Sequence, residues 1–505
     1  MKPSRRDMLK AMVASAAAAS TPSVAQGATP RWNVLVLCAD EHHAGAMGVE
    51  GHPDAYTPNL DALAADGAML DRCYVSSPVC APTRQSWLTG LHPEEHGQMG
   101  NQYVFDGGNS GLPEVFQALG YDTACFGKLH TRSGIEGDGA FGFDRVLNQN
   151  TSDWSELRRS HRDKALGTFT VPSTEDWTTM PFSGFSGRSL SDPALVPDWV
   201  LTQEAASYVE QSRTNPFFCY LSLRAPHYPF WLPSSDYGLF DPAGVTVATV
   251  ASDALDASPG GQRAASSYNW AGMSDTENRL VLARYLDSVA FADRMFGVIL
   301  SALAMAGLAK NTLVVYLSDH GDMMGEKGLW LKNVAFEGAT RKPAILRMPG
   351  VIPKGIRLGQ LVSEVDLLPT MIGLAGGQSE LPTGLSGKDL SEALLLEAHG
   401  VPSQTWARSH GVRARTHTFS SNFHNSTSYL PWMRVVQDER YKLVRYETQA
   451  GKKTYELYDL ESDPSEETNL ADSADSGEIQ DELDAALDDH VDQLRDPEFA
   501  PKLAA

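Results

Sequence analysis

The chain has 505 residues and a formal net charge of -22, and 42% of its residues are hydrophobic. This composition is typical of a globular protein with a hydrophobic core. The acidic balance argues against a nucleic-acid-binding protein and against a polybasic membrane-surface protein, because both need clustered Lys and Arg. Five cysteines are too few for a disulfide scaffold in a chain of this length, and their odd number leaves at least one thiol unpaired.

Residues 1–30 are predicted to be a twin-arginine-type signal peptide. A basic start that contains Arg5 and Arg6 precedes a short run of small residues, and a small-residue cleavage site ends at Ala25. The run is far shorter than the ~20 residues that span a bilayer. We therefore expect the mature protein in the periplasm or outside the cell, with the twin-arginine export machinery as a partner. No later segment is expected to cross a membrane. A disordered basic tail is the alternative.

Residues 31–390 are predicted to form one α/β domain. Apolar runs of strand length alternate with helical patterns, and the last helix opens with a capping box of Ser274 and Glu277. The predicted strands are 33–38, 122–126, 216–223 and 313–317, and the predicted helices are 57–66, 112–119 and 274–306. This alternation predicts a large mixed, mainly parallel sheet sandwiched by helices.

Two segments within this domain are rich in Ser, Pro, Gly and Asp. They run from 150 to 200 and from 233 to 273. We expect long loops there, of the kind that cover a substrate cleft.

Residues 391–505 are predicted to form a smaller C-terminal α+β subdomain. Short strand patterns at 433–437, 441–446 and 454–460 are separated by turns, which indicates an antiparallel sheet. An acidic helix over 478–494 is expected to close the chain.

Polar side chains directly follow two of the predicted buried strands. Asp40 and Glu41 come after the first strand, and Asp319 and His320 come after the strand at 313–317. Ligands of open α/β sheets collect beyond the carboxyl ends of the strands. The sequence therefore places chemistry-bearing groups where a ligand would bind.

The sharpest motif of the chain runs from Cys80 to Gly90 and reads C-x-P-x-R followed by Thr-Gly. It is accompanied by further short motifs, at 120–123 (GYDT), 127–130 (GKLH), 226–227 (PH), 318–321 (SDHG), 337–338 (EG, preceded by Lys332) and 455–470. Together these segments resemble the formylglycine-dependent (type I) sulfatases of the alkaline phosphatase superfamily. The resemblance covers residues 31–472.

The resemblance implies an alkaline phosphatase-like fold and an enzyme that hydrolyses a sulfate ester to an alcohol and inorganic sulfate. Cys80 would be converted to formylglycine by a formylglycine-generating or sulfatase-maturing enzyme. One hydroxyl of the hydrated aldehyde would attack sulfur, and the second would expel sulfate, which an unmodified Ser or Cys cannot do. A sulfated carbohydrate is the expected substrate, with aryl and choline-type sulfates as alternatives.

The resemblance also implies a role for each matching residue. Arg84 would hold the diol, His130 would act as the base, and His227 would be the acid for the leaving group. The substrate contacts would be Lys128, His227, Lys332 and Asn101. The ligands of a divalent metal, Ca²⁺ or alternatively Mg²⁺ or Mn²⁺, would be Asp40, Glu41, residue 80, Asp319 and His320.

Three positions depart from the usual pattern of the family. Glu41 stands where a second Asp is usual and is one methylene longer, so it is expected to ligate differently or to point elsewhere. Thr83 occupies a position where Ser or Ala is usual. His320 replaces the commoner Asn, which selects a branch of the family.

Other interpretations remain open from the sequence. A phosphonate monoester or phosphodiester hydrolase of the same superfamily can use the same nucleophile and an Asp-His metal pair. A non-catalytic carbohydrate-binding relative would have no reason to retain the whole set of site residues. Cys80 could also be an unmodified buried thiol at a helix start. The cysteines of the predicted strands, Cys38, Cys125 and Cys219, are expected to be buried apolar residues.

Overall fold

The computed structural model describes residues 32–101, 111–130, 140–148, 177–179, 186–190, 196–248, 255–256, 258–268, 270, 273–397, 415–422, 432–448, 451–471, 473 and 475–494. The predicted signal peptide lies outside these residues, as does most of the predicted loop from 150 to 200.

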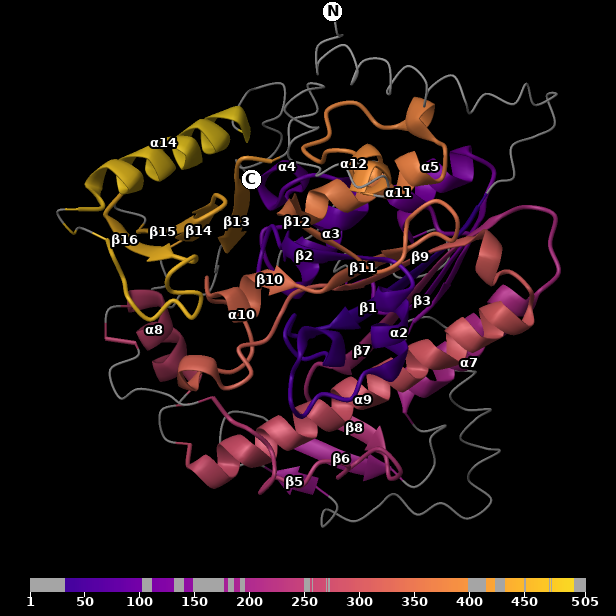
Figure 1. The fold of residues 1–505 in the computed structure, drawn as a ribbon, viewed down its shortest axis with the longest axis horizontal. Coiled ribbons are helices and arrows are strands. Elements are labelled where there is room, and N and C mark those ends of the chain that lie inside the picture. The colour runs from indigo at the N-terminus through magenta and orange to yellow at the C-terminus, as the bar shows by residue number, and fades with distance from the viewer. Residues whose placement is uncertain are drawn as a thin grey trace, which may run out of the picture. The chain divides into compact units, whose positions relative to one another are not determined.

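A nine-stranded sheet forms the centre of the described part of the chain (Figure 1). Its strands lie in the order β10-β2-β11-β9-β1-β7-β3-β4, and β12 pairs with β2. The strands are β1 (Asn33–Asp40), β2 (Ala68–Tyr74), β3 (Asp122–Gly127), β4 (Arg145–Leu147), β7 (Phe217–Pro226), β9 (Thr312–Ser318), β10 (Arg341–Lys342), β11 (Ala344–Arg347) and β12 (Ile356–Ser363). The run from β9 to β4 is parallel, whereas β11 and β10 are antiparallel to their neighbours. The predicted mixed, mainly parallel sheet is confirmed.

Helices cover both faces of this sheet, as the alternation of side chains along β7 shows. Cys219 and Leu221 point into a core cluster shared with α2 (Pro58–Ala65), α7 (Pro197–Glu210) and α9 (Asp275–Met305). On the opposite face, Phe218 stacks on a ring of α5 (Leu112–Ala118), and Tyr220 meets a ring of α3 (Cys80–Thr89). A strand covered on both faces must be apolar at every position, which explains the continuous apolar runs in the sequence.

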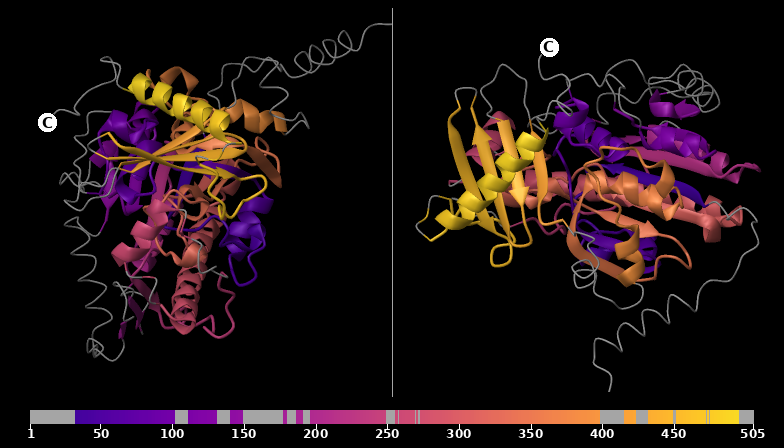
Figure 2. Two further views of the ribbon diagram at one scale, coloured as in Figure 1. Left: turned by 90° about the vertical axis from the view of Figure 1, so that its left-hand side faces the viewer. Right: turned by 90° about the horizontal axis from the view of Figure 1, so that it is seen from above.

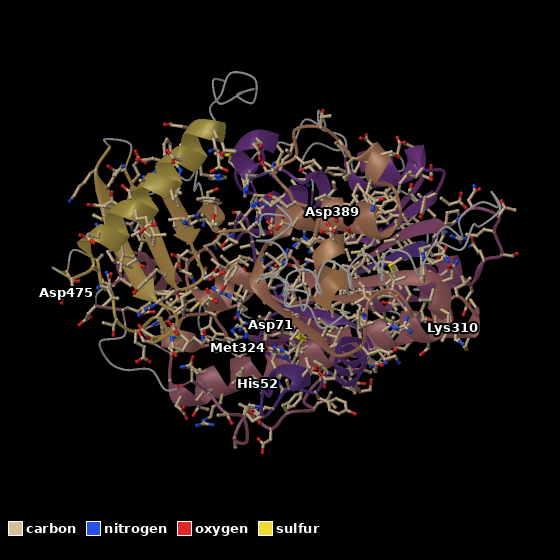
Figure 3. The ribbon with its side chains drawn as sticks, turned by 45° about the horizontal axis from the view of Figure 1, so that its top comes forward. His52, Asp71, Lys310, Met324, Asp389 and Asp475 are labelled. Carbon is tan, nitrogen blue, oxygen red and sulfur yellow. The ribbon has the colours of Figure 1, made fainter. Side chains whose placement is uncertain are left out.

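One helix corrects an expectation about membrane segments. By length and composition α9 could cross a membrane, so the prediction that no later segment qualifies was wrong on those criteria. In the structure, 67% of its most apolar window is buried. It packs against α2, α7 and β7 and is joined to β9 by the turn that holds Lys310, labelled in Figure 3. This is the environment of the core helix of a folded protein.

The C-terminal region has the predicted antiparallel sheet and closing helix. The sheet contains β13 (Thr418–Asn422), β14 (Trp432–Gln437), β15 (Tyr441–Glu447) and β16 (Lys453–Asp459). Helix α14 (Gly477–Leu494) lies along it and buries Leu483 and Leu487 against Val436, Leu443 and Leu457 (Figure 2). Strand β13 was not predicted, and the domain boundary at 390 stays a prediction.

The segment from 233 to 273 was expected to be a loop, but it contains α8 (Pro259–Tyr268). This helix begins with Pro-Gly-Gly and contains no large aliphatic side chain, so local propensity argues against it. Ala265 nevertheless joins a core cluster with Met433 of β14 and Tyr446 of β15. Packing against the C-terminal sheet therefore stabilises a helix that the sequence pattern hides.

Candidate active site

The carboxyl ends of four adjacent parallel strands carry the predicted site residues. β1 ends at Asp40, and its neighbour β9 is followed by Asp319, whose backbone N–H donates to Ala39 at 3.1 Å. β7 ends at Pro226, beside Asp40 in the register, and delivers His227. β3 ends at Gly127 and delivers Lys128. Sheet topology therefore brings together side chains that lie far apart in the sequence.

The predicted nucleophile sits at the start of α3, which begins at Cys80. The Cys80 thiol lies 3.1 Å from Nε2 of His320 and 3.7 Å from Oδ1 of Asp40. Together with Asp319, these residues form a buried cluster whose ligand atoms all lie within 4.8 Å of one another.

The electrostatic environment favours a negative charge at position 80. Burial opposes ionisation of the thiol, but Lys128, Lys332 and His320 outweigh it and hold the pKa of Cys80 well below its ordinary value. The amino end of α3 adds the positive end of a helix dipole. An anionic oxygen at this position would meet the same field.

His320 is oriented for ligation by its own backbone. Its Nδ1 lies 2.8 Å from the carbonyl oxygen of Gly321, so Nδ1–H donates there and Nε2 faces the cluster. Burial lowers the pKa of His320, but the Asp319 carboxylate and Cys80 together outweigh burial and raise that pKa to about 9. A divalent cation in the cluster would take the place of that proton.

Arg84 is completely buried and is held by four groups. Its Nε donates to Oδ2 of Asp319 at 2.9 Å. One terminal nitrogen donates to the backbone oxygen of Lys128 at 2.7 Å, to Ser222 at 2.7 Å and to Tyr220 at 3.1 Å. The other terminal nitrogen, Nη2, has no hydrogen-bond partner among the described residues and lies 3.9 Å from Oδ2 of Asp40. A bound group at the cluster can satisfy that donor.

The two predicted sulfate-binding lysines form ion pairs at the end of β1. Lys128 forms an ion pair with Asp40, and Lys332 lies 3.0 Å from Oε2 of Glu41.

The predicted base, His130, interacts with the Cys80 thiol. Burial and, to a smaller extent, Lys128 lower the pKa of the His130 imidazole, which favours the neutral form that a base requires.

Glu41 lies outside the four-residue cluster. Its Oε2 contacts Lys332 and also lies 3.3 Å from Nε2 of His227. Of the predicted metal ligands, the structure therefore brings together Asp40, Cys80, Asp319 and His320 and places Glu41 beside them.

Comparison with known proteins identifies the family. The Sulfatase family model matches residues 32–377, and the model for the C-terminal region of N-sulphoglucosamine sulphohydrolase matches residues 325–493. The chain belongs to the sulfatase family. It is accordingly a sulfuric ester hydrolase of the alkaline phosphatase superfamily.

Similar sulfatases act on different esters. The chain is 26% identical to an ulvan-active sulfatase of Formosa agariphila, over 92% of this chain and 82% of that protein. It is 25% identical to an N-acetylglucosamine-6-O-sulfatase of Bacteroides thetaiotaomicron (93% and 88%) and 27% identical to a choline-sulfatase of Rhizobium meliloti (88% and 83%). A solved phosphonate monoester hydrolase of Agrobacterium radiobacter shares the fold, with a TM-score of 0.74, 24% identity and coverage of 92% and 96%.

The sulfatase pocket has a volume of about 490 Å³ and opens onto Cys80. The predicted substrate contacts line it, namely Asn101, Lys128, His227 and Lys332. Asn101 also has a structural task, because its Oδ1 accepts a hydrogen bond from the backbone N–H of Ala81 at 3.0 Å. It thereby satisfies a free donor in the first turn of α3.

A buried network that sequence reasoning missed supports the nucleophile helix. The Thr83 hydroxyl donates to the backbone oxygen of Asp319 at 3.0 Å and also contacts Glu364. Glu364 pairs with Lys342 at 2.7 Å, and all three side chains are buried. Thr83, which stands where the family usually has Ser or Ala, thus connects α3 to the end of β9 through a hydrogen bond. Glu364 and Lys342 carry no local pattern that would reveal this.

The cluster fits the divalent metal that the sulfatase family implies. Two carboxylates and one imidazole nitrogen converge in a buried space with the residue 80 side chain, so two of the four donors are hard carboxylate oxygens. The cation would neutralise the sulfate charge. Asp40, Asp319, His320 and residue 80 would hold it.

Metal removal is therefore expected to abolish turnover. Treatment with a chelator should lower the hydrolysis rate at least ~100-fold, because charge neutralisation by a cation contributes several kcal/mol. Reconstitution with Ca²⁺, Mg²⁺ or Mn²⁺, followed by rate and metal-content measurements, identifies the active ion. Full activity in a sample shown to be metal-free would contradict this expectation.

Proposed function

We propose that this sulfatase removes sulfate from a sulfated carbohydrate and uses a formylglycine made from Cys80. The observation that carries the proposal is the buried position of Cys80, where a metal-type cluster, Arg84 and two lysines surround a single side chain. An ordinary structural cysteine needs none of these groups.

Each residue then has a defined task. Formylglycine supplies two hydroxyls on one carbon, of which one bonds to sulfur and the other allows sulfate to leave. Lys128 and Lys332 bind sulfate oxygens, and Arg84 orients the diol. His227 donates a proton to the ester oxygen as its bond to sulfur breaks. His130 then takes the proton of the second hydroxyl as sulfate departs.

The mouth of the pocket supports a carbohydrate substrate. Trp231 lines the pocket with 40% of its surface exposed, and the exposed Arg224 lines the same pocket. An exposed indole offers an apolar face on which a sugar ring can stack, and a guanidinium can bind a further anionic group. The ulvan and N-acetylglucosamine sulfatases among its relatives act on sugars.

Replacing Trp231 by Ala tests the carbohydrate assignment. KM for a sulfated oligosaccharide is expected to rise about tenfold, because stacking contributes roughly 1 kcal/mol or more. The kcat for a small aryl sulfate should stay within about twofold, since that ester does not reach the mouth. Equal effects on both esters would contradict the assignment.

A phosphonate monoester or phosphodiester hydrolase is the second candidate. The Asp319–His320 pair and the fold shared with phosphonate monoester hydrolases favour it. Turnover of sulfated sugars, an aryl sulfate and an aryl phosphonate should be compared in one preparation. Mass spectrometry of the Cys80 peptide should find an aldehyde in place of the thiol. Turnover of phosphoesters but not of sulfate esters would overturn the proposal.

Export through the twin-arginine pathway forms part of the same proposal. All five cysteines are free and buried, so the fold depends on no disulfide formed after export. A chain that folds and is oxidised at Cys80 before it leaves the cytoplasm suits a pathway for folded proteins. Fractionation of cells that express the full chain should place the mature protein outside the cytoplasm, and retention of the uncleaved chain inside would contradict this.

A further inference from the structure

Glu41 is held by its backbone in an unusual conformation directly after Asp40. Its φ angle is 70°, in the left-handed region that non-glycine residues rarely adopt. The backbone N–H donates to Oδ1 of Asp319 at 2.9 Å, and the carbonyl oxygen accepts from the hydroxyl of Tyr285 at 2.8 Å. These two bonds compensate for the strain and hold Glu41 in place.

The buried carboxylate of Glu41 contacts two side chains of the pocket, Lys332 and His227. A single oxygen, Oε2, lies 3.0 Å from Nζ of Lys332 and 3.3 Å from Nε2 of His227. His227 is also held from the other side, because its Nδ1 contacts the carbonyl oxygen of Tyr228 and its ring stacks on the Tyr228 ring at 4.7 Å. Nε2 therefore has one defined direction.

We propose that Glu41 is a positioning residue that holds His227 and Lys332 for the departing ester oxygen, and that it is not a metal ligand. This inference rests on the proposed function. One carboxylate oxygen in contact with both Nζ of Lys332 and Nε2 of His227 fixes the direction of both groups before the substrate binds. The extra methylene, compared with the usual Asp, lets the carboxylate reach Lys332 from the end of β1.

The statement that Glu41 is not a metal ligand can be tested by measuring metal affinity, which requires no turnover. The metal-free wild type, Glu41→Ala and Asp319→Asn should each be titrated with Mn²⁺ by calorimetry. Glu41→Ala is expected to weaken binding less than about tenfold, whereas loss of a ligand in Asp319→Asn should weaken it more than about 100-fold. A loss of more than about tenfold in Glu41→Ala would overturn the proposal.

The statement that Glu41 positions His227 can be tested by measuring how the rate depends on the leaving group of the ester. Glu41→Gln is expected to lower kcat for an alkyl or sugar sulfate about 100-fold and for a nitrophenyl sulfate less than about fivefold, because a good leaving group needs little proton donation. Equal losses on both esters would refute a role in positioning His227. In a His227→Ala background, Glu41→Gln should leave the ratio of the two rates unchanged. A further change in that ratio would also refute it.

A matched control is available in the same chain. Glu326 also pairs with a histidine, His43, at 3.3 Å, but neither residue lines the pocket. Glu326→Gln should leave both rates within about twofold of the wild type. If Glu41→Gln fails to fold by circular dichroism, Glu41→Asp replaces it and should show the same leaving-group pattern. A wild type that is inactive on every sulfate ester would defeat the proposed function, while the metal titration would still decide the role of Glu41.

Discussion

Replacing Cys80 by Ala is expected to lower turnover of every sulfate ester at least ~10⁴-fold, because it removes the nucleophile itself. The site around it should persist, since Asp40, Asp319 and His320 are positioned by β1 and β9 and not by the thiol. Steady-state rates on a sulfated sugar and on an aryl sulfate, together with thermal melting, measure both effects.

Cys219→Ala is the matched control for this substitution. Cys219 is an equally buried thiol, but it lies in β7 and points into the cluster shared with α7 and α9, away from the pocket. The free energy of unfolding of the Cys219→Ala variant should be about 1 kcal/mol lower than that of the wild type, and its turnover should be unchanged. Residual activity of Cys80→Ala above one per cent of wild type, which corresponds to a loss of less than about 2.7 kcal/mol at the transition state, would show that another group attacks the ester.

Arg84→Lys is expected to remove activity and to destabilise the chain. The guanidinium bonds simultaneously to Asp319, Ser222, Tyr220 and the Lys128 backbone, and an ammonium cannot reach these acceptors from one position. Acceptors left unpaired in a fully buried site each cost about 1–3 kcal/mol. We expect the free energy of unfolding to fall by about 3 kcal/mol and kcat/KM to fall ~10³-fold.

Denaturant unfolding and kinetics of Arg84→Lys check both numbers. Arg145→Lys is the control, because Arg145 pairs with Glu204 at 3.4 Å in a partly exposed position. Exposed ion pairs contribute about 1 kcal/mol or less, so this variant should match the wild type. An Arg84→Lys enzyme that retained both stability and rate would show that the buried hydrogen bonds do not organise the site.

The strands of the central sheet were predictable because burial on both faces leaves a local mark. The apolar runs of β1, β7 and β9 mark the strands and their ends, and the polar residues after them mark the edge where ligands bind. Strands β2, β4, β10, β11 and β12 of this sheet were missed. They are short or mixed in polarity, and their place in the sheet depends on antiparallel or crossover pairing with distant segments.

The sequence by itself determined the nucleophile motif, the pairs at Asp40 and Asp319, and the family to which they belong. Only the tertiary structure decided which groups meet in the pocket. Glu41 pairs with Lys332 across 291 positions of the chain and Thr83 with Glu364 across 281, and Glu41 also contacts the distant His227. Such contacts arise from strand order and helix packing, whereas periodicity and spacing report only on neighbours along the chain. The negative net charge of the chain opposes attraction of an anionic ester by the overall electric field. We therefore expect the buried cations of the pocket to bind that ester.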